Sequence, residues 1–483
     1  MNRDTMLQRL ANETFDVLIV GGGATGLGCA VDAASRGYRT ALVEAADFAA
    51  GTSSRSTKLI HGGVRYLAQG NVHLVREALR ERALLYRNAP YLVRPLAFLT
   101  PAYRWHEIPY YLAGLKFYDL LAGARDDFGR SRFVSQRETL HRLPWLRARD
   151  LHGAIEYHDG QFDDARLAIA LARTAADHGA ALANYTACIA LSDATEPFRI
   201  VTVRDVETSA QFAIRARVVV NACGVFADAL RRLDDPQAAP LLSLSRGTHL
   251  VFAAGVLSSR DALLIPKTDD RRVIFAIPWH GRTLVGTTDV PERDPVADPA
   301  PTDDEIAYLL ATISAYTQTS VGGDGVSASF AGLRPLLDRR AAATTAALSR
   351  EHFVEVSANG LVTIAGGKWT TYRKMAQDAV DAAARRAALS PSPCVTHALA
   401  LHDDTRDELQ ALVSERPELG EPLYDGFAYI KADVVNGFRR EMARTIDDIL
   451  ARRTRLSFLD DRAAQGCRAI VSSYAAAERA SAD

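Results

Sequence analysis

The chain contains 483 residues, of which 48% are hydrophobic and 24% are charged, and its net charge is −1. This length predicts two or three domains, because a single core rarely grows beyond roughly 250–300 residues. The composition is typical of a globular protein. The near-zero net charge excludes a strongly basic nucleic-acid binder, so no nucleic-acid partner is expected.

Cysteines and apolar stretches set further limits. The five cysteines are widely spaced and form no CxxC pair, which argues against a disulfide framework and against a zinc site, so no metal is expected. Residues 1–15 lack the continuous apolar stretch of a secretory signal. Because about eighteen uncharged apolar residues never occur in succession, we expect any membrane contact to be peripheral.

A strand–turn–helix–strand pattern organises the N-terminal region. The apolar run 16–20 predicts a buried parallel strand, 27–36 a helix that Gly37 ends, and 40–43 a second strand. Glu44 follows this second strand about twenty residues beyond a glycine-rich turn, where a carboxylate can accept hydrogen bonds from the hydroxyls of an adenosine ribose. Its charge would also repel a 2′-phosphate.

The turn itself, GGGATG, has the spacing of a dinucleotide-binding site. Gly21 makes a tight turn, Gly23 lets the backbone approach a pyrophosphate, and Gly26 lets helix and strand pack closely. The backbone around Ala24 and Thr25 then holds the pyrophosphate at the helix N-terminus, where free N–H groups favour anions. The pattern predicts dinucleotide binding without deciding between FAD and NAD.

The next segment, 52–66, is dense in hydroxyl groups and glycine, with one lysine, one histidine and two arginines. Such residues suit a loop that covers phosphates and a flavin ring. A solvated polar loop that caps a helix would have a similar composition. The position directly after the dinucleotide motif favours the first interpretation.

Later elements alternate in type. Helices are predicted over 76–85, 164–178, 303–317 (capped by Thr302) and 371–387, and strands over 183–190, 199–204, 211–215, 217–221, 249–252, 263–265, 273–279, 283–286 and 360–364. Pro90, Pro95, Pro101 and Pro109 indicate an irregular segment after the first of these helices, and the stretch 103–121 is rich in aromatic residues. That stretch could lie at a membrane interface or beside a quinone entrance, although a helix packed in the protein's own core is favoured.

The stretch 53–67, SSRSTKLIHGGVRYL, closely resembles a signature of FAD-dependent glycerol-3-phosphate dehydrogenases, within the D-amino-acid-oxidase-like flavoproteins. The resemblance continues, in the right order, through 74–101, 163–167, 219–228, 246–252, 274–289, 330–337 and 366–376. It covers most of residues 15–376, and the stretch 442–464 resembles the C-terminal helical domain of the same enzymes. The residue types of 400–483 suggest packing and surface salt bridges, with no part in the chemistry.

The resemblance implies an α/β fold (α+β overall) with three domains. These are a Rossmann-like FAD-binding domain (1–90, 151–235 and 355–388), an inserted substrate domain with an antiparallel sheet (91–150 and 236–354), and a C-terminal helical domain (389–483). The cofactor is expected to be FAD. Its contacts are expected from Gly21, Gly23, Ala24, Thr25, Gly26, Glu44, Ser53, Ser54, Ser56, Thr57, Lys58, His61, Gly62, Gly63, Ala222, Gly224, Gly332, Gly367, Lys368, Trp369 and Thr370.

The expected reaction is oxidation of sn-glycerol 3-phosphate to dihydroxyacetone phosphate by hydride transfer to FAD, with the electrons passed to a quinone. A phosphate dianion requires cations, preferably arginine forks, and Arg65, Arg334 and Lys368 match family positions that line the substrate pocket. Arg334 and Lys368 are also expected to be catalytic. Tyr66 and Thr287 are expected to orient the substrate.

His249 is the leading candidate for a general base that also binds the substrate, because an imidazole titrates near working pH. His61 is the competitor and could instead hydrogen-bond the flavin. A purely structural role remains an alternative for both His249 and His61. Cys223 stands where threonine is usual in the group, and is interpreted as a small packing residue.

Two rival functions share the fold. A glycerol-3-phosphate oxidase would pass its electrons to oxygen, and an amine or amino-acid oxidase would require an arginine for a carboxylate. A flavin-bearing interaction protein without turnover is the alternative from another class. The quinone implies a peripheral location on the cytoplasmic side of the inner membrane, or a cytoplasmic one, and a homodimer is one option for the assembly.

Overall fold

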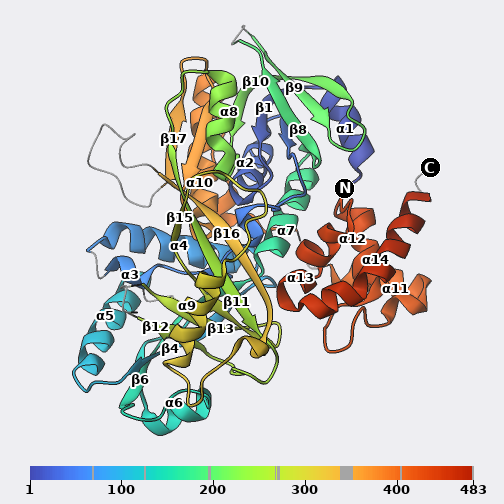
Figure 1. Cartoon of the computed structure of the whole chain (residues 1–483). Coiled ribbons are helices and arrows are strands. Elements are labelled where there is room, and N and C mark those ends of the chain that lie inside the picture. Colours follow the sequence, from blue (N-terminus) through green and yellow to red (C-terminus); the bar gives the residue numbers. More distant parts are fainter. Residues whose placement is uncertain are drawn as a thin grey trace.

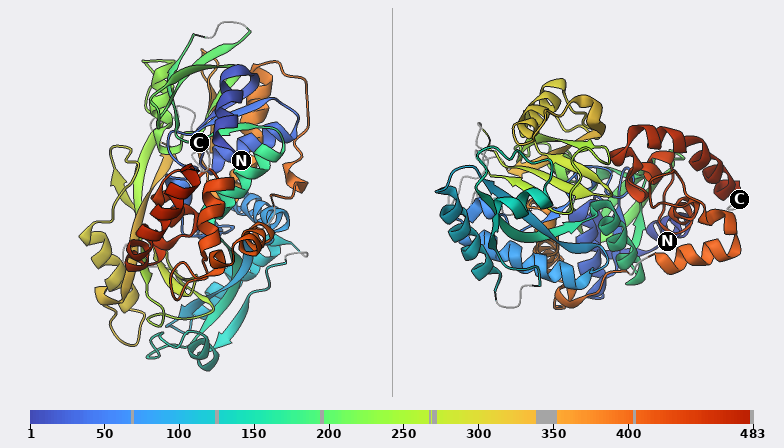
Figure 2. Two further views of the ribbon diagram at one scale, coloured as in Figure 1. Left: turned by 90° about the vertical axis from the view of Figure 1, so that its right-hand side faces the viewer. Right: turned by 90° about the horizontal axis from the view of Figure 1, so that it is seen from below.

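The computed structural model describes residues 1–67, 70–123, 127–193, 197–266, 268, 272–337, 352–402 and 405–480. Its strands form one sheet of eight strands and one of ten, and a group of C-terminal helices packs to one side of them (Figures 1 and 2). Within these residues, no helix has the length and apolar character needed to cross a membrane.

The eight-stranded sheet is built around β1, whose apolar side chains alternate between its two faces. Val17 and Ile19 pack with the helices on one face, whereas Leu18 packs with Leu10 and Leu230 on the other. The strand order is β17 (His352–Val356), β18 (Val362–Gly366), β10 (Gln211–Asn221), β1 (Thr14–Val20), β2 (Thr40–Val43) and β7 (Ala181–Ala183), and β8 (Thr186–Leu191) pairs with β9 (Arg199–Asp205), which pairs with β10. From β18 to β7 neighbouring strands are parallel, as the predicted Rossmann-like fold requires.

Helices cover both faces of this sheet. The hydrophobic cluster on the side of Val17 and Ile19 includes residues of α2 (Ala24–Ser35), α7 (Asp164–Asp177) and α10 (Tyr372–Arg386). The opposite side carries α1 (Arg3–Asn12) and α8 (Ala227–Asp234). The predicted elements around the glycine-rich turn are therefore confirmed, with α2 beginning three residues before the predicted start.

The ten-stranded sheet lies beside the first and is largely antiparallel. Its main path runs β15 (Val290–Glu292), β11 (Leu242–Phe252), β14 (Arg282–Gly286), β13 (Ile274–Trp279), β12 (Ala262–Ile265), β4 (Val93–Ala102), β6 (Gly153–Phe162) and β3 (Leu59–Ile60), with β16 (Val326–Leu337) on β11 and β5 (Arg132–Ser135) on β6. Five helices accompany it: α3 (Val64–Leu67), α4 (Val72–Asn88), α5 (Glu107–Ala122), α6 (Gln136–Arg142) and α9 (Asp303–Ser314). The hairpin predicted across 280–282 is confirmed as β13–β14.

Three predictions of elements are wrong. The strands predicted separately over 211–215 and 217–221 are one strand, β10. The proline-rich segment is not irregular, since β4 contains Pro95 and Pro101 and pairs with β6 along its length. On its other side β4 pairs with β12 only at Phe98 and Leu99, so neither proline nitrogen has to donate a hydrogen bond there. The single strand predicted over 183–190 is two strands, because the chain turns at Tyr185 with a φ of 51°.

The predicted domain boundaries also differ from the sheets. Residues of β3 and β6 belong to the ten-stranded sheet, although the sequence placed them in the FAD-binding domain. The reason is that β6 directly precedes α7 in the sequence, and nothing in its residues indicates that it pairs with the strands of the ten-stranded sheet. The division into three domains stays a prediction.

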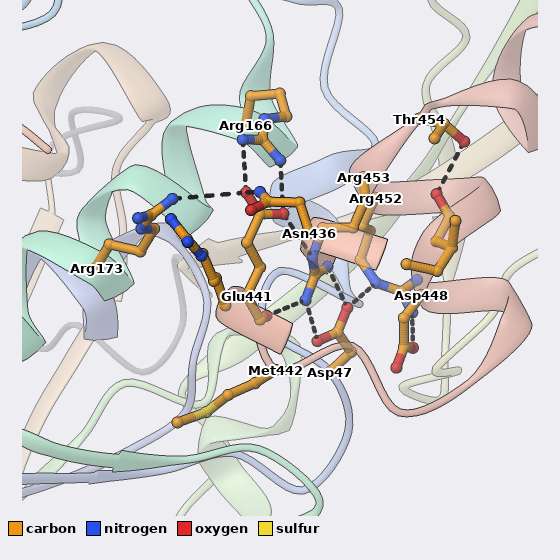
Figure 3. Close-up of polar contacts among 12 residues, drawn as sticks. Asp47, Arg166, Arg173, Asn436, Glu441, Met442, Asp448, Arg452, Arg453 and Thr454 are labelled. Atoms are coloured by element: carbon orange, nitrogen blue, oxygen red, sulfur yellow. Dashed lines mark hydrogen bonds and ion pairs between the residues drawn. The ribbon is translucent and has the colours of Figure 1, made fainter. Parts of the chain in front are cut away.

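The C-terminal helices are α11 (Arg406–Glu415), α12 (Lys431–Arg440), the π-helix η7 (Asp448–Arg453), α13 (Leu456–Leu459) and α14 (Asp461–Ala480), with a hydrophobic core of their own. They dock on the first domain through buried charges. Asp47 accepts hydrogen bonds from Arg452 and Arg453 (2.6 and 2.8 Å to its Oδ2), as Figure 3 shows. Burial alone would raise the pKa of Asp47, but the two arginines lower it to about 2.

The prediction that salt bridges of this region lie on the surface is therefore wrong for this interface. Glu441 pairs in the same way with Arg166, which donates to both carboxylate oxygens at 2.8 Å (Figure 3). Removing one partner of a buried ion pair costs about 3–5 kcal/mol, because the other charge is left uncompensated.

Candidate active site

A cavity of about 1420 Å³ lies where the parallel strands of the first sheet end and the second sheet begins. Its lining includes the residues that follow β1, β2, β10 and β18, together with His249 on β11 and Arg334 on β16. Ligands of open α/β sheets bind outside the carboxyl ends of the strands. The cavity therefore occupies the position expected for a nucleotide cofactor and extends to the second sheet.

The glycine-rich turn has the close contacts that its spacing predicts. A Cβ on Gly26 would lie 1.8 Å from the carbonyl oxygen of Gly21, and Gly21 itself has a φ of 112°. At Gly23 a Cβ would meet Ser53 Oγ at 3.0 Å. The backbone N–H of Ala24 donates to the same Ser53 Oγ at 2.9 Å, so the hydroxyl-rich loop is joined to the first turn of α2.

Glu44 lies at the end of β2 and lines the cavity. Its carboxylate accepts hydrogen bonds from the backbone N–H groups of Gly22 (2.6 Å) and Ala46 (2.8 Å). Burial raises the pKa of Glu44, while these two hydrogen bonds act in the opposite direction. A glycine-walled turn at the start of α2 and a carboxylate beside it fit the pyrophosphate and ribose of FAD.

Most predicted site residues line this cavity. They are Gly21, Gly23, Ala24, Thr25, Glu44, Ser53, Ser56, Thr57, His61, Gly63, Tyr66, Ala222, Gly224, His249, Thr287, Gly332, Arg334, Gly367, Lys368, Trp369 and Thr370. Gly26 does not line it and acts through helix packing. The side chain of Arg65 lies outside the described residues.

Three further predicted cofactor residues do not reach the cavity wall. Ser54 and Lys58 are fully buried beneath the loop, and Lys58 Nζ donates to Asp164 Oδ2 at 2.6 Å. Burial lowers the pKa of Lys58 to about 7, against the opposing effect of Asp164. Gly62 is buried against Tyr118, whose hydroxyl accepts from its N–H at 2.8 Å. The sequence indicates a cation in a phosphate loop and gives no sign that a carboxylate over 100 positions later holds it.

The βα unit formed by β18 and α10 also lines the cavity. Trp369 Nε1 donates to the carbonyl oxygen of Ser53 at 2.9 Å, and the N–H of His61 donates to Thr370 Oγ1 at 3.2 Å. These contacts hold the turn between β18 and α10 against the hydroxyl-rich loop. Burial, Lys368 and Arg82 lower the pKa of His61 to about 3, so its imidazole is neutral at working pH.

His249 lies on β11, lines the cavity and is only 2% exposed. Its Nε2 is 3.0 Å from Thr57 Oγ1, and its ring stacks on Phe330 with centroids 4.9 Å apart. Its Nδ1 is buried, with no hydrogen-bond partner among the described residues. Burial, followed by the charges of Lys58 and Arg334, lowers the pKa of His249 well below its usual value.

Two of the predicted cations, Arg334 and Lys368, line the cavity. Arg334 Nη2 donates to Thr287 Oγ1 at 3.0 Å and to the carbonyl oxygen of Thr288 at 3.1 Å, and its side chain is 32% exposed. Lys368 Nζ lies 3.8 Å from the ring centroid of Tyr66. The structure thus pairs Arg334 with Thr287 and Lys368 with Tyr66, and all four residues, from four separate motifs, line one cavity.

Sequence reasoning missed two residues of this site. Asp289 lies 3.4 Å from Arg334 Nη1 and accepts a hydrogen bond from Ser245. Phe330 forms the surface on which His249 stacks. Both residues lie inside stretches that carry the family resemblance. Their place in these motifs could therefore have indicated them from the sequence.

Comparison with known families identifies two matches that together span nearly the whole chain. Residues 16–373 match the family described as FAD dependent oxidoreductase. Residues 362–481 match the C-terminal domain of alpha-glycerophosphate oxidase.

Individual proteins give the same result. The chain is 41% identical over 516 aligned positions to proteins named "Glycerol-3-phosphate dehydrogenase, mitochondrial" from Mus musculus and Homo sapiens, covering 96% of this chain and 70% of each relative. A solved glycerol-3-phosphate dehydrogenase from Bacillus halodurans, in complex with FAD, has a TM-score of 0.78 at 30% identity and covers 98% of this chain and 92% of its own. An L-alpha-glycerophosphate oxidase from Mycoplasma pneumoniae, at 22% identity and a TM-score of 0.62, shares the fold.

Proposed function

We propose how this chain, which belongs to the FAD-dependent glycerol-3-phosphate dehydrogenases, binds and oxidises its substrate. The observation that carries the proposal is one cavity that joins the dinucleotide turn at Gly21 to His249, Arg334 and Lys368. FAD, when bound, supplies the acceptor for the hydride of the secondary alcohol. The chain's own residues orient the alcohol, bind its phosphate and accept its hydroxyl proton.

The phosphate is held by Arg334 and Lys368. Arg334 is oriented by its hydrogen bonds to Thr287 and Thr288, and Lys368 by the ring of Tyr66. Because these contacts fix the two cations before substrate arrives, little side-chain entropy is lost when the phosphate binds. Charge-assisted hydrogen bonds from a guanidinium to a phosphate are among the stronger polar contacts in proteins.

His249 accepts the hydroxyl proton at Nε2, the ring nitrogen beside Thr57 Oγ1. A general base has to be neutral before the reaction, and the lowered pKa of His249 keeps it so at neutral pH. The stacking contact with Phe330 fixes the plane of the imidazole. His61 shares the lowered pKa, so the two histidines are distinguished by mutation and not by charge state.

The electrons pass from FAD to a quinone. We propose that the quinone reaches the cavity on the side lined by α5. Tyr110 and Phe117 line the cavity and are also exposed on the outside of the helix, at 68% and 43%. Nearby, Trp105 is 74% exposed and Leu120 is 71% exposed. The predicted helix packed in the core describes one face of α5, buried at Leu115, Tyr118 and Asp119, while its other face is exposed.

Exposed aromatic and aliphatic side chains on α5 and at Trp105 just before it suit the interfacial region of a bilayer. We therefore propose peripheral membrane contact through α5. Replacing Trp105 and Leu120 with serine should reduce co-flotation with phospholipid vesicles, while anaerobic flavin reduction by glycerol 3-phosphate stays at the wild-type rate. Equal flotation of variant and wild type would place the contact elsewhere.

The function is tested by flavin bleaching. Anaerobic protein with FAD bound should lose its flavin absorbance on addition of glycerol 3-phosphate, and a soluble quinone should restore it much faster than air. Absence of bleaching would contradict the substrate. Stoichiometric peroxide release under steady-state turnover in air would instead indicate a glycerol-3-phosphate oxidase. Bleaching by an amino acid would indicate an amine or amino-acid oxidase.

A further inference from the structure

We propose that the C-terminal helical domain positions the general base, through Arg455 and Phe458 on its innermost segment. This inference rests on the proposed role of His249. The two residues reach His249 by separate routes, one polar and one aromatic. The domain is therefore part of the active site, and its role is not limited to packing.

The polar route runs beneath the hydroxyl-rich loop. Arg455, fully buried, donates from Nη2 to the carbonyl oxygen of Ser54 at 2.9 Å and to Asp164 Oδ1 at 3.0 Å. The other oxygen of Asp164 accepts from Ser56 Oγ at 2.7 Å and from Lys58 Nζ at 2.6 Å. The loop is thus held at 54, 56 and 58, on either side of the residue that meets His249.

That residue is Thr57, whose Oγ1 lies 3.0 Å from His249 Nε2. Its neighbours on both sides are fixed by Asp164, so the position of its hydroxyl depends on that carboxylate. Asp164 depends in turn on Arg455, because two cations share its two oxygens. Loss of Arg455 would leave one oxygen of a fully buried carboxylate with a single remaining contact, from the backbone N–H of Ala165.

The aromatic route starts one turn later in the C-terminal domain. Phe458, on α13, meets the ring of Phe330 edge-on, with centroids 4.8 Å apart at 78°. Phe330 stacks on His249 at 4.9 Å and 19°. Lys58 Nζ also lies 5.1 Å from the centroid of Phe330. The imidazole is therefore bounded by the Thr57 hydroxyl at Nε2 and by a ring that Phe458 holds in place.

Docking alone does not account for these contacts. Asp47 with Arg452 and Arg453 already joins the domain to the first sheet (Figure 3). Replacing a buried ion pair with apolar side chains is often neutral or stabilising, so packing alone does not require a further buried cation. Arg455 also has a φ of 60°, which is uncommon for a residue with a Cβ. This conformation begins α13 and so places Phe458 against Phe330.

The test compares Arg455→Met, Arg455→Lys and Phe458→Leu with a matched control, Arg468→Ala. Arg468 also forms an ion pair in this domain, with Asp447 at 2.7 Å, but on the surface. Each protein is saturated with FAD, and anaerobic flavin reduction by glycerol 3-phosphate is followed over pH. FAD affinity and thermal unfolding are measured on the same samples.

Arg455→Met should lower the limiting reduction rate on the order of tenfold, the effect of one lost charged hydrogen bond. KM for glycerol 3-phosphate should change little, because Arg334 and Lys368 bind the phosphate. The groups that face His249 are Lys58 and Arg334, with Asp164 behind Lys58. As water enters around the imidazole, the ascending limb of the pH profile should move to higher pH, and Phe458→Leu should move it in the same direction.

Arg455→Lys should restore part of the rate, and Arg468→Ala should behave as wild type. The inference is wrong if Arg455→Met and Phe458→Leu lower only the unfolding temperature, while the rate and pH limb at FAD saturation stay unchanged. If Arg455→Met does not fold, Phe458→Leu decides alone. An unchanged pH profile in His249→Asn would instead contradict the proposed role of His249 as the base. That outcome would be distinct from a failure of the inference about Arg455 and Phe458.

Discussion

Ser53 Oγ lies 2.9 Å from the backbone nitrogen of Ala24 and accepts its hydrogen bond. This contact joins the two segments from which the cofactor site was inferred, the glycine-rich turn and the hydroxyl-rich loop. Gly23 lies beside it, and a Cβ there would be 3.0 Å from the same oxygen. The absence of a side chain at Gly23 therefore leaves room both for a pyrophosphate and for the serine that caps α2.

Gly23→Val should abolish FAD retention. Two methyl groups would fill the space that the pyrophosphate needs and would displace Ser53 from Ala24. Flavin stoichiometry after purification measures the effect. Gly323→Val is the matched control, because a Cβ there meets nothing within 4 Å and Gly323 is not among the residues that line the cavity. A yellow Gly23→Val protein with full flavin content would contradict the proposal that the glycine-rich turn binds the pyrophosphate of FAD.

Glu44→Ala should weaken FAD binding and leave the chemistry intact. The variant loses the acceptor for the N–H groups of Gly22 and Ala46 as well as the proposed contact to the ribose. A hydrogen bond to a charged group is worth about 1.5–3 kcal/mol, so the Kd should rise by roughly one to two decades. Excess FAD should restore the rate of flavin reduction by substrate. Failure of that rescue would give Glu44 a further role.

The sequence predicts the cofactor half of this molecule well, because its determinants are local. Gly21, Gly26 and Glu44 lie within one strand–helix–strand unit. Their positions in the structure therefore follow from their spacing in the sequence. Strand β4 was missed because two prolines usually exclude a strand, and only the partial pairing with β12 makes them acceptable.

The buried charges could not be predicted, because their partners are far apart in the sequence. Lys58 and Asp164 are separated by over 100 positions, and Arg455 by almost 300 more. Lysine in a hydroxyl-rich loop suggests a phosphate ligand, and only the tertiary structure shows a carboxylate beneath it. For the same reason the arginines of the C-terminal domain were interpreted as surface residues, although Arg453 and Arg455 are among the most buried side chains.

The pH dependence of flavin reduction should report His249. The base has to be neutral, and its pKa lies well below the usual 6.5, so the ascending limb should fall below pH 6.5 and the rate should be level from there to pH 8. His249→Asn should lower the rate by roughly 10²–10⁴-fold and remove this limb. The same rate loss and limb change in His61→Asn, with His249→Asn unaffected, would transfer the role to His61.

The proposed phosphate clamp yields the sharpest comparison. Arg334→Lys keeps the charge but loses the planar fork that also reaches Thr287 and Thr288, so it should already weaken substrate binding, and Arg334→Ala should weaken it more. A lost charged contact costs about 1.5–3 kcal/mol, or roughly one to two decades in affinity for glycerol 3-phosphate. Steady-state KM and anaerobic substrate titrations measure it.

Glycerol serves as the internal control, because it has the same secondary alcohol and no phosphate. It should be a poor substrate of the wild type, and neither Arg334 substitution should change its rate much. The reason is that the charge of Arg334 contributes less than burial to the lowered pKa of His249. If Arg334→Ala slowed glycerol and glycerol 3-phosphate by the same factor with FAD fully bound, Arg334 would act on the reaction centre itself. The phosphate would then have to be bound by Lys368 without it.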